Sequence, residues 1–197
     1  MIQFSIKKKD SPYMKVFREY EKAKSLSQKN IEAFCLSTCG KSLKPSSRFV
    51  NIKYIKDGEL IFFTNYNSKK ANEIEENENV SGVFYWSKTG VQIRFEGKIK
   101  KTSSAFSDEH FKKRSIEKNI LAISSNQSSV IDSYEKVLEN YQKTMDDNDF
   151  MQRPNYWGGY SIEPNLIEIW QSHSNRLNKR TVYSLKDNEW TNFILEP

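Results

Sequence analysis

The clearest hydrophobic pattern in the chain is an alternation of apolar and polar residues between positions 90 and 101. The odd positions hold apolar residues or glycine: Val91, Ile93, Phe95, Gly97 and Ile99. Such a period of two predicts a β-strand with one face on a core and the other toward solvent or a ligand. Gln92 would lie on the polar face, near the start of this strand.

A second strand pattern lies between positions 47 and 64. Two runs rich in β-branched and aromatic residues, 47 to 55 and 59 to 64, flank the pair Asp57-Gly58. An Asp-Gly pair between two such runs is a strong hairpin signal. We therefore expect a β-hairpin here.

Helical spacing follows the hairpin. Ala71 and Ile74 stand among charged residues in a pattern that predicts a helix over 68–77, with Asn67 or Ser68 as its N-cap. Lys69 and Lys70 then fall in the first turn, where the helix dipole is already positive and each cation costs roughly 0.3–1 kcal/mol. A bound anion would reverse this cost. The alternative is two solvated lysines on a surface helix.

The rest of the chain reads as more strands with inserted helices. Strands are expected at 33–39, 80–86, 159–170, 173–185 and 189–195, and one or two short helices within 103–123. Because no βαβ rhythm appears, the order favours a small antiparallel barrel over a doubly wound sheet. Residues 1–30 are expected to be a mobile arm followed by a helix over 13–23, and residues 31–197 a single domain.

A further helix is expected to start at Asp132, after a polar connection over 124–131. Glu135 stands three residues after Asp132, as in a capping box. The helix would carry an apolar stripe, formed by Tyr134, Leu138, Tyr141 and Met145. Residues 146–154 would form a loop.

Composition agrees with one globular domain. The chain has 197 residues, 37% of them hydrophobic and 13% aromatic, which is typical of a folded core rather than of disorder. No apolar run approaches the ~20 residues of a membrane span, and the N-terminus lacks the apolar core of a secretion signal. We therefore expect a cytoplasmic protein without a membrane partner.

The two cysteines, Cys35 and Cys39, fit a reducing compartment. In a strand, four residues span about 13 Å, which exceeds the ~7 Å limit between the Cα atoms of a disulfide. Two cysteines and two histidines scattered in this way make no metal site.

The net charge of +6 is compatible with nucleic acid or with small anionic ligands. The basic residues are spread along the chain with acidic residues between them, and no expected helix carries a basic stripe. This distribution argues against a nucleic-acid partner.

Seven short segments resemble, in order and at matching separations, the pyridoxine/pyridoxamine 5′-phosphate oxidase family. They are RFVNIK, FFTNYNSKKANEIEEN, FYW, the Gln of VQIRFEGK, NQSS, PNYWGGY and IEIWQSHSNRLNKR. Each segment alone is weak, but together they run from Arg48 to the C-terminal Leu-Glu-Pro. The resemblance implies a mainly β, antiparallel, Greek-key-like FMN-binding split β-barrel, active as a homodimer with FMN at the subunit interface.

The same resemblance implies which residues bind the cofactor. Lys69 and Lys70 would hold the FMN phosphate, which explains their place in the helix; the family usually has Arg at the position of Lys69. The full set implied for FMN is Arg48, Phe49, Val50, Asn51, Ile52, Lys53, Phe63, Thr64, Lys69, Lys70, Gln92, Gln127, Ser128, Trp170 and Arg180.

The substrate positions depart further from the family. The implied set is Lys53, His110, Arg114, Lys118, Arg176 and Asn178, with Arg176 as the catalytic residue over the reacting carbon. His110 replaces a Tyr, Lys118 a Ser and Asn178 a His. The Gly-Ala-Trp that usually precedes the Gln-Ser pair is Leu121-Ala122-Ile123 here.

The resemblance implies an FMN-dependent oxidase that converts pyridoxine or pyridoxamine 5′-phosphate to pyridoxal 5′-phosphate, in vitamin B6 metabolism. Hydride would pass from C4′ of the substrate to flavin N5, and O2 would reoxidise the flavin to give H2O2. Two alternatives follow from the altered substrate positions. One is a related oxidase of another anionic aromatic molecule, as in phenazine biosynthesis, and the other is a flavin- or pyridoxal-phosphate-binding protein without efficient turnover.

Overall fold

The structure is a computed structural model that describes residues 1–9, 11–56, 58–146 and 150–197. These residues form ten strands and five helices. The strands are β1 Gln3–Ser5, β2 Ala33–Cys39, β3 Pro45–Asn51, β4 Tyr54–Lys56, β5 Glu59–Asn65, β6 Asn79–Trp86, β7 Val91–Lys101, β8 Trp157–Gln171, β9 Lys179–Lys186 and β10 Glu189–Leu195. The helices are α1 Pro12–Ser25, α2 Lys69–Glu76, α3 Ser104–Lys112, α4 Ile116–Ser124 and α5 Tyr134–Met145.

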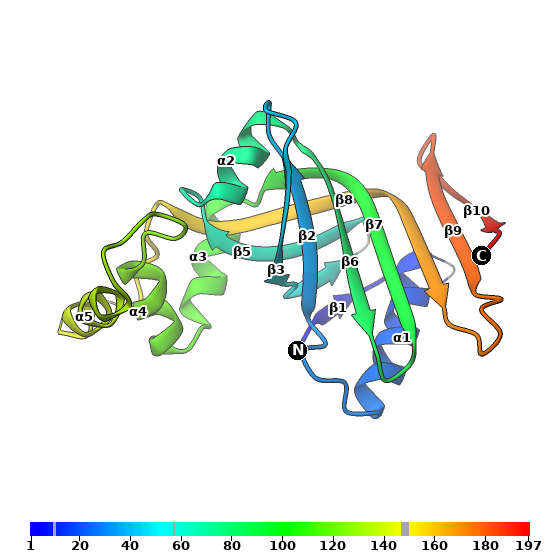
Figure 1. The fold of residues 1–197 in the computed structure, drawn as a ribbon, viewed down its shortest axis with the longest axis horizontal. Coiled ribbons are helices and arrows are strands. Elements are labelled where there is room, and N and C mark those ends of the chain that lie inside the picture. The colour runs from blue at the N-terminus through cyan, green and yellow to red at the C-terminus, as the bar shows by residue number, and fades with distance from the viewer. Residues whose placement is uncertain (10, 57, 147–149) are drawn as a thin grey trace.

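The fold is mainly β, as predicted, and its sheet curls into an open barrel (Figure 1). The long strand β8 organises the sheet. One edge of β8 pairs with β7, and its other edge pairs first with β5 and then with β9. Pro164, which cannot donate a ladder hydrogen bond, lies between these two partners and opposite a bulge at Glu96 and Gly97. The two halves of β8 therefore belong to two different parts of the sheet.

Strand β7 shows the predicted alternation. Its odd positions from 91 to 99 are buried, and Ile93 and Phe95 are at most 1% exposed, whereas its even positions are partly or fully exposed. The buried face joins one hydrophobic core that also includes Phe34, Phe84 and Trp86. This packing confirms the prediction of a strand with one core face.

The predicted strand over 47–55 is wrong as a single element. The chain changes partner between β3, which pairs with β2, and β4, which pairs with β5. The amide of Ile52 donates to Glu32 O at 3.0 Å, just before β2. The next amide, that of Lys53, donates to Ile61 O at 2.8 Å, on β5, so the change of partner falls between these two residues. The predicted hairpin is therefore β4–β5. Gly58 has the positive φ of 87° that such a turn favours, and Asp57 lies outside the described residues.

The N-terminal residues are more ordered than a mobile arm. Strand β1 pairs in parallel with β4, and Ile2 is 6% exposed. Helix α1 buries Tyr13, Val16 and Tyr20 in the same core as the sheet. The expected helix is confirmed, and the division of the chain at residue 30 stays a prediction.

Two further expectations need correction. Ser133, not Asp132, caps α5, since the Ser133 side chain accepts a hydrogen bond from the amide of Lys136. The strand expected over 173–185 begins only at Lys179, because residues 172–178 turn between β8 and β9.

The apolar stripe of α5 lies on the outside of the chain. None of the α5 residues is buried, and Tyr134 and Leu138 are 71% and 53% exposed. The helix therefore contributes nothing to the core of this chain.

The remaining expectations concern the cysteines, metal sites and membrane-spanning helices. Cys35 and Cys39 are both free. Among the described residues, no group of His, Cys, Asp and Glu could hold a metal ion. Within those residues no helix is both long and apolar enough to cross a membrane.

Candidate functional site

The first turn of α2 holds a buried lysine. Lys70 is 7% exposed, and its Nζ donates to Ser68 Oγ at 3.0 Å and to Thr64 Oγ1 and Gln127 Oε1, each at 3.1 Å. All three acceptors are neutral, and no carboxylate in the described part of the chain forms an ion pair with Lys70. Burial, helped by the nearby charge of Arg48, lowers the pKa of Lys70 to about 8. This ammonium group is therefore desolvated without a counter-charge.

Its neighbour Lys69 behaves differently. Helix α2 begins at Lys69 with Ser68 as N-cap, so both lysines lie in the first turn as predicted. The Lys69 side chain is 69% exposed, and its Nζ lies 3.9 Å from Oε1 of Glu73. The sequence pattern could not distinguish the two lysines, because their burial depends on β5 and on the loop that carries Gln127.

Arg48 is fixed beside this turn by Glu73. Its guanidinium donates to Glu73 at 3.2 Å, and also to Thr38 and Ser46. Burial raises the pKa of Glu73, but hydrogen bonds from Thr38, Ser46 and Arg48 outweigh it and leave the pKa below its ordinary value. Arg48 therefore stays next to an ionised carboxylate on α2.

A cavity of about 260 Å³ lies between β5 and the α3–α4 segment. It brings together five of the predicted site residues and five others. Its walls are Phe63, Thr64, Asn65, Arg114, Lys118, Leu121, Ala122, Ser125, Gln127 and Trp157. Because Thr64 and Gln127 also contact Lys70, the buried ammonium and the cavity form one site.

An aromatic stack supports this cavity. The ring of His110 lies flat on Phe63, with centroids 3.6 Å apart and planes 4° apart, and Trp157 stacks on Phe63 at 5.4 Å. His110 Nδ1 lies 2.9 Å from the hydroxyl of Tyr54. Burial first, then the charges of Arg114 and Lys53, lower the pKa of His110 to about 4. His110 is therefore neutral near pH 7 and can act only through hydrogen bonding and stacking.

Arg114 supplies the cavity with a positive charge. Its guanidinium carbon lies 4.3 Å from the centroid of the Trp157 ring, and its Nη2 donates to Lys118 O at 2.8 Å. Nη1 is buried and has no hydrogen-bond partner among the described residues. Burial lowers the pKa of Arg114 to about 10. A half-buried guanidinium with one unpartnered nitrogen is suited to binding an anion.

The donor set fits a phosphate. Lys70 and Arg114 present desolvated positive groups, and the first turn of α2 adds backbone N–H groups and its dipole. All three hydrogen-bond acceptors of Lys70 are neutral, so its ammonium gains a counter-charge only if an anion binds. The residues present therefore fit the phosphate of a nucleotide-like cofactor.

A second group of predicted residues lies at the far end of β8. Gln92 pairs with Trp170, and Trp170 pairs with Arg180, so the three lie in one row across β7, β8 and β9. Phe63 of the first group pairs with Gly159, near the start of β8. Gly159 and Trp170 are eleven positions apart on β8, an extended chain length of about 36 Å. One chain therefore does not bring the two groups together (Figure 1).

The remaining predicted residues flank these two groups. Lys53 forms an ion pair with Glu32 at 2.9 Å. Arg176, with φ of 59°, and Asn178, which accepts from the His173 amide, lie in the turn between β8 and β9, so they belong with the second group. The others are Phe49, which is 73% exposed, Val50, Asn51, the buried Ile52 and Ser128.

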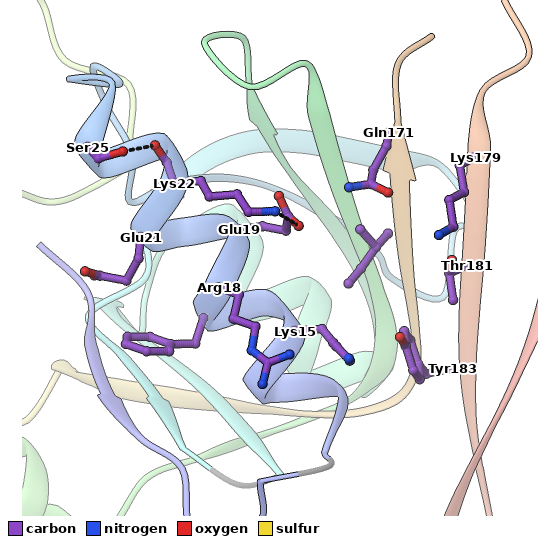
Figure 2. A pocket seen from close by; sticks show the side chains of 12 residues that line it. Lys15, Arg18, Glu19, Glu21, Lys22, Ser25, Gln171, Lys179, Thr181 and Tyr183 are labelled. Atoms are coloured by element: carbon purple, nitrogen blue, oxygen red, sulfur yellow. Dashed lines mark hydrogen bonds and ion pairs between the residues drawn. The ribbon is translucent and has the colours of Figure 1, made fainter.

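A larger cleft, of about 710 Å³, lies elsewhere (Figure 2). It separates α1 from β8 and β9, and Lys22 and Glu19 on its helical wall form an ion pair at 2.9 Å. It is lined by none of the predicted residues. Size therefore does not identify the candidate site; the desolvated charges do.

Sequence reasoning missed residues that act through others. Tyr54 bonds to His110, Glu73 holds Arg48, and Trp157 stacks beneath Arg114. Trp157 was visible as part of PNYWGGY, whereas nothing local in the sequence links Glu73 or Tyr54 to their partners.

Fold and site together define a class of protein, a split β-barrel with a cationic pocket at the start of the helix that follows its hairpin. The profile described as Pyridoxamine 5′-phosphate oxidase matches residues 21–140. The one described as Pyridoxine 5′-phosphate oxidase C-terminal dimerisation region matches residues 157–197. The chain belongs to the pyridoxine/pyridoxamine 5′-phosphate oxidase family.

Individual relatives agree. The chain is 39% identical over 181 residues to the pyridoxine/pyridoxamine 5′-phosphate oxidase of Leptospira biflexa, covering 90% of this chain and 85% of that one. PhzG from Burkholderia lata 383, solved with tetrahydrophenazine-1-carboxylic acid, superposes with a TM-score of 0.89 at 27% identity, covering 95% and 93% of the two chains. A pyridoxamine 5′-phosphate oxidase-related, FMN binding protein from Nostoc punctiforme shares the fold, with a TM-score of 0.78 at 16% identity and coverage of 95% and 98%.

Proposed function

We propose that the protein is an FMN-dependent oxidase that converts pyridoxine or pyridoxamine 5′-phosphate to pyridoxal 5′-phosphate. The observation that carries the proposal is Lys70, a buried ammonium group bonded only to neutral acceptors at the start of a helix. Such a group is stabilised by a phosphate, and FMN is the phosphate-bearing cofactor that this family implies. The free thiols agree with a reducing, cytoplasmic location.

Lys70 and the first turn of α2 would hold the FMN phosphate, with Arg48 beside them. Thr64 and Gln127 already fix the Lys70 ammonium, so the charge is oriented before the ligand arrives. When bound, FMN would supply the redox chemistry of an oxidase.

The cavity residues would hold the substrate phosphate. Arg114 offers unused donors, and Lys118 lies on the same wall. His110 offers a ring for stacking and no charge, since its pKa is about 4. Arg176 would lie over the reacting carbon, where its charge would act on the charge that develops as the hydride leaves.

The site would be completed by a second copy of the chain. Gln92, Trp170 and Arg180 lie at the opposite end of β8 from Lys70, and the C-terminal region matches the dimerisation profile. In a homodimer, one protomer would supply the phosphate site and its partner the Gln92–Trp170–Arg180 row.

A second function is supported by the likeness to PhzG. That protein was solved with a tetrahydrophenazine carboxylic acid, an anionic aromatic molecule without a phosphate. The replacements at His110, Lys118 and Asn178 leave room for such a substrate. The relatives named as pyridoxine/pyridoxamine 5′-phosphate oxidases favour the B6 substrate.

Oxygen uptake by purified protein reconstituted with FMN tests the choice. Pyridoxine and pyridoxamine 5′-phosphates should drive O2 consumption with production of H2O2, while tetrahydrophenazine-1-carboxylic acid should not. The Arg176→Ala variant should keep its flavin and lose turnover. If the phenazine compound drives O2 uptake and the B6 phosphates do not, the second function is supported instead of the first. If the purified protein retains no FMN, both functions are contradicted.

A further inference from the structure

Glu168 is a buried carboxylate held between two arginines. Its side chain is 3% exposed, its Oε1 accepts from Arg180 Nε at 2.7 Å, and its Oε2 accepts from Arg94 Nη2 at 2.7 Å and Nε at 3.2 Å. Burial raises the pKa of Glu168, but the hydrogen bonds from Arg180 and Arg94 outweigh it and keep the pKa below its ordinary value. The carboxylate is therefore ionised and shared by three adjacent strands.

The arginines face the side of the sheet that carries the predicted flavin residues. Directly paired residues share a face, so Arg94 with Glu168 and Gln92 with Trp170 and Arg180 lie together. The alternate residues Gln171 and Lys179 line the α1 cleft on the other face (Figure 2). The Glu168 cluster is thus on the flavin-facing side and separate from the cleft.

Two of the three nitrogens of Arg180 are already used. Nε donates to Glu168, and Nη1 donates to the carbonyl of Glu196 at 3.2 Å. Within the described residues, Nη2 has no hydrogen-bond partner. The guanidinium is therefore held in one orientation with one free pair of N–H donors.

Arg94 has a different role. Its Nε and Nη2 bond to Glu168 and its Nη1 to Glu96, so all its nitrogens are occupied. Arg94 balances the charge of Glu168 from β7 and keeps the carboxylate oriented toward β9. Of the two arginines, Arg180 is therefore the one with a nitrogen available to bind a ligand.

We propose that Glu168 is a positioning residue, which acts through Arg180 by aiming the free donors of that side chain at the flavin. This inference rests on the proposed function, because it requires FMN to bind against the Gln92–Trp170–Arg180 row. A glutamine at position 168 would accept from one arginine but present an N–H to the other. The negative charge is therefore needed as well as the shape.

A double-mutant cycle on FMN affinity tests the proposal. Glu168→Gln in the otherwise native protein should weaken FMN binding by about tenfold, roughly the effect of misplacing one charge-assisted hydrogen bond. In an Arg180→Met background the same change should alter affinity by less than about twofold, because residues that act as a unit are not additive. A purely structural role would instead weaken binding by the same factor in both backgrounds.

The matched control is Glu96→Gln, which removes a carboxylate on the other side of Arg94 and should leave FMN affinity unchanged. If Glu168→Gln does not fold, as judged by circular dichroism, Glu168→Asp provides the same cycle by withdrawing the carboxylate one methylene from Arg180. If the native protein and the Glu168 variants bind FMN equally well, the positioning role is wrong and the proposed function stands. Native protein that binds no FMN overturns the proposed function and this role together.

Discussion

At the scale of single residues, the site depends on desolvated charges. Lys70 and Arg114 both have their pKa values lowered by burial, and neither forms an ion pair with a carboxylate in the described parts of the chain. A charge buried in this way costs stability in the free protein, and the cost is recovered when an anion binds. The same burial makes His110 neutral. Under the proposed function, these residues would bind anions at a cost in the stability of the free protein.

The pH dependence of FMN binding follows from Lys70. With a pKa of about 8, its amine loses its proton as the pH rises through 8, so FMN affinity should be highest below pH 8 and fall above it. Lys70→Met should remove this step and weaken binding at pH 7 by about 10- to 100-fold, the usual effect of a hydrogen bond to a charged group. Fluorescence titration with FMN from pH 6 to 9.5 measures both. Lys70→Arg is the control, because it keeps the positive charge and should show no fall in FMN affinity near pH 8. If the FMN affinity of the native protein does not change across pH 8, Lys70 does not bind the FMN phosphate.

At the scale of elements, strand β8 is shared by two parts of the sheet, and the switch requires close backbone approach. Gly97 on β7 lies where a bulge shifts the register opposite Pro164. A Cβ at position 97 would lie 2.2 Å from the carbonyl oxygen of Glu163 and 2.7 Å from Cα of Pro164, both of them backbone atoms. Only glycine permits this contact without movement of a strand.

Gly97→Ala should therefore destabilise the fold by about 1–3 kcal/mol, the usual cost of overpacking a tight site. Urea unfolding followed by circular dichroism measures the free energy of unfolding. The neighbouring Lys98→Ala, at an exposed position on the same strand, should change it by less than about 0.5 kcal/mol. Equal stability of the Gly97 variant and native protein would show that β7 and β8 can separate freely at the bulge.

At the scale of the whole molecule, the two halves of the proposed site lie at opposite ends of β8. The Lys70 group and the Gln92–Trp170–Arg180 row meet only if two chains associate. The residues matched by the dimerisation profile, 157–197, include the row's Trp170 and Arg180. The exposed apolar residues of α5 and of the C-terminal strand, such as Leu138 and Phe193, leave surface available for such association.

Subunit complementation tests this arrangement. Lys70→Met and Arg180→Met homodimers should each bind FMN weakly at both sites. Mixing the two and allowing exchange should produce heterodimers with one site that combines native Lys70 and native Arg180, so flavin binding should return at about one site per heterodimer. Flavin titration of the mixture, with the unmixed variants as controls, measures this. No recovery in proven heterodimers would place each complete site within one chain.

The local features of this protein follow from its amino-acid sequence alone. The alternation in β7, the bounds of β2 and β10, and the position of Lys69 and Lys70 in a first helical turn all follow from neighbours in sequence. The segment matches from Arg48 onward also identified the family. These features are readable because periodicity, turn chemistry and motif order are local properties of the chain.

Which groups lie together depends on the folded chain. The chain over 47–55 divides because its backbone groups bond to β2 on one side of Ile52 and to β5 on the other. Lys70 is buried and Lys69 exposed because β5 and the loop of Gln127 cover one and not the other. Glu168 meets Arg94 and Arg180 through strand register. Burial and pairing of this kind depend on contacts between residues far apart in sequence, and no local pattern specifies them.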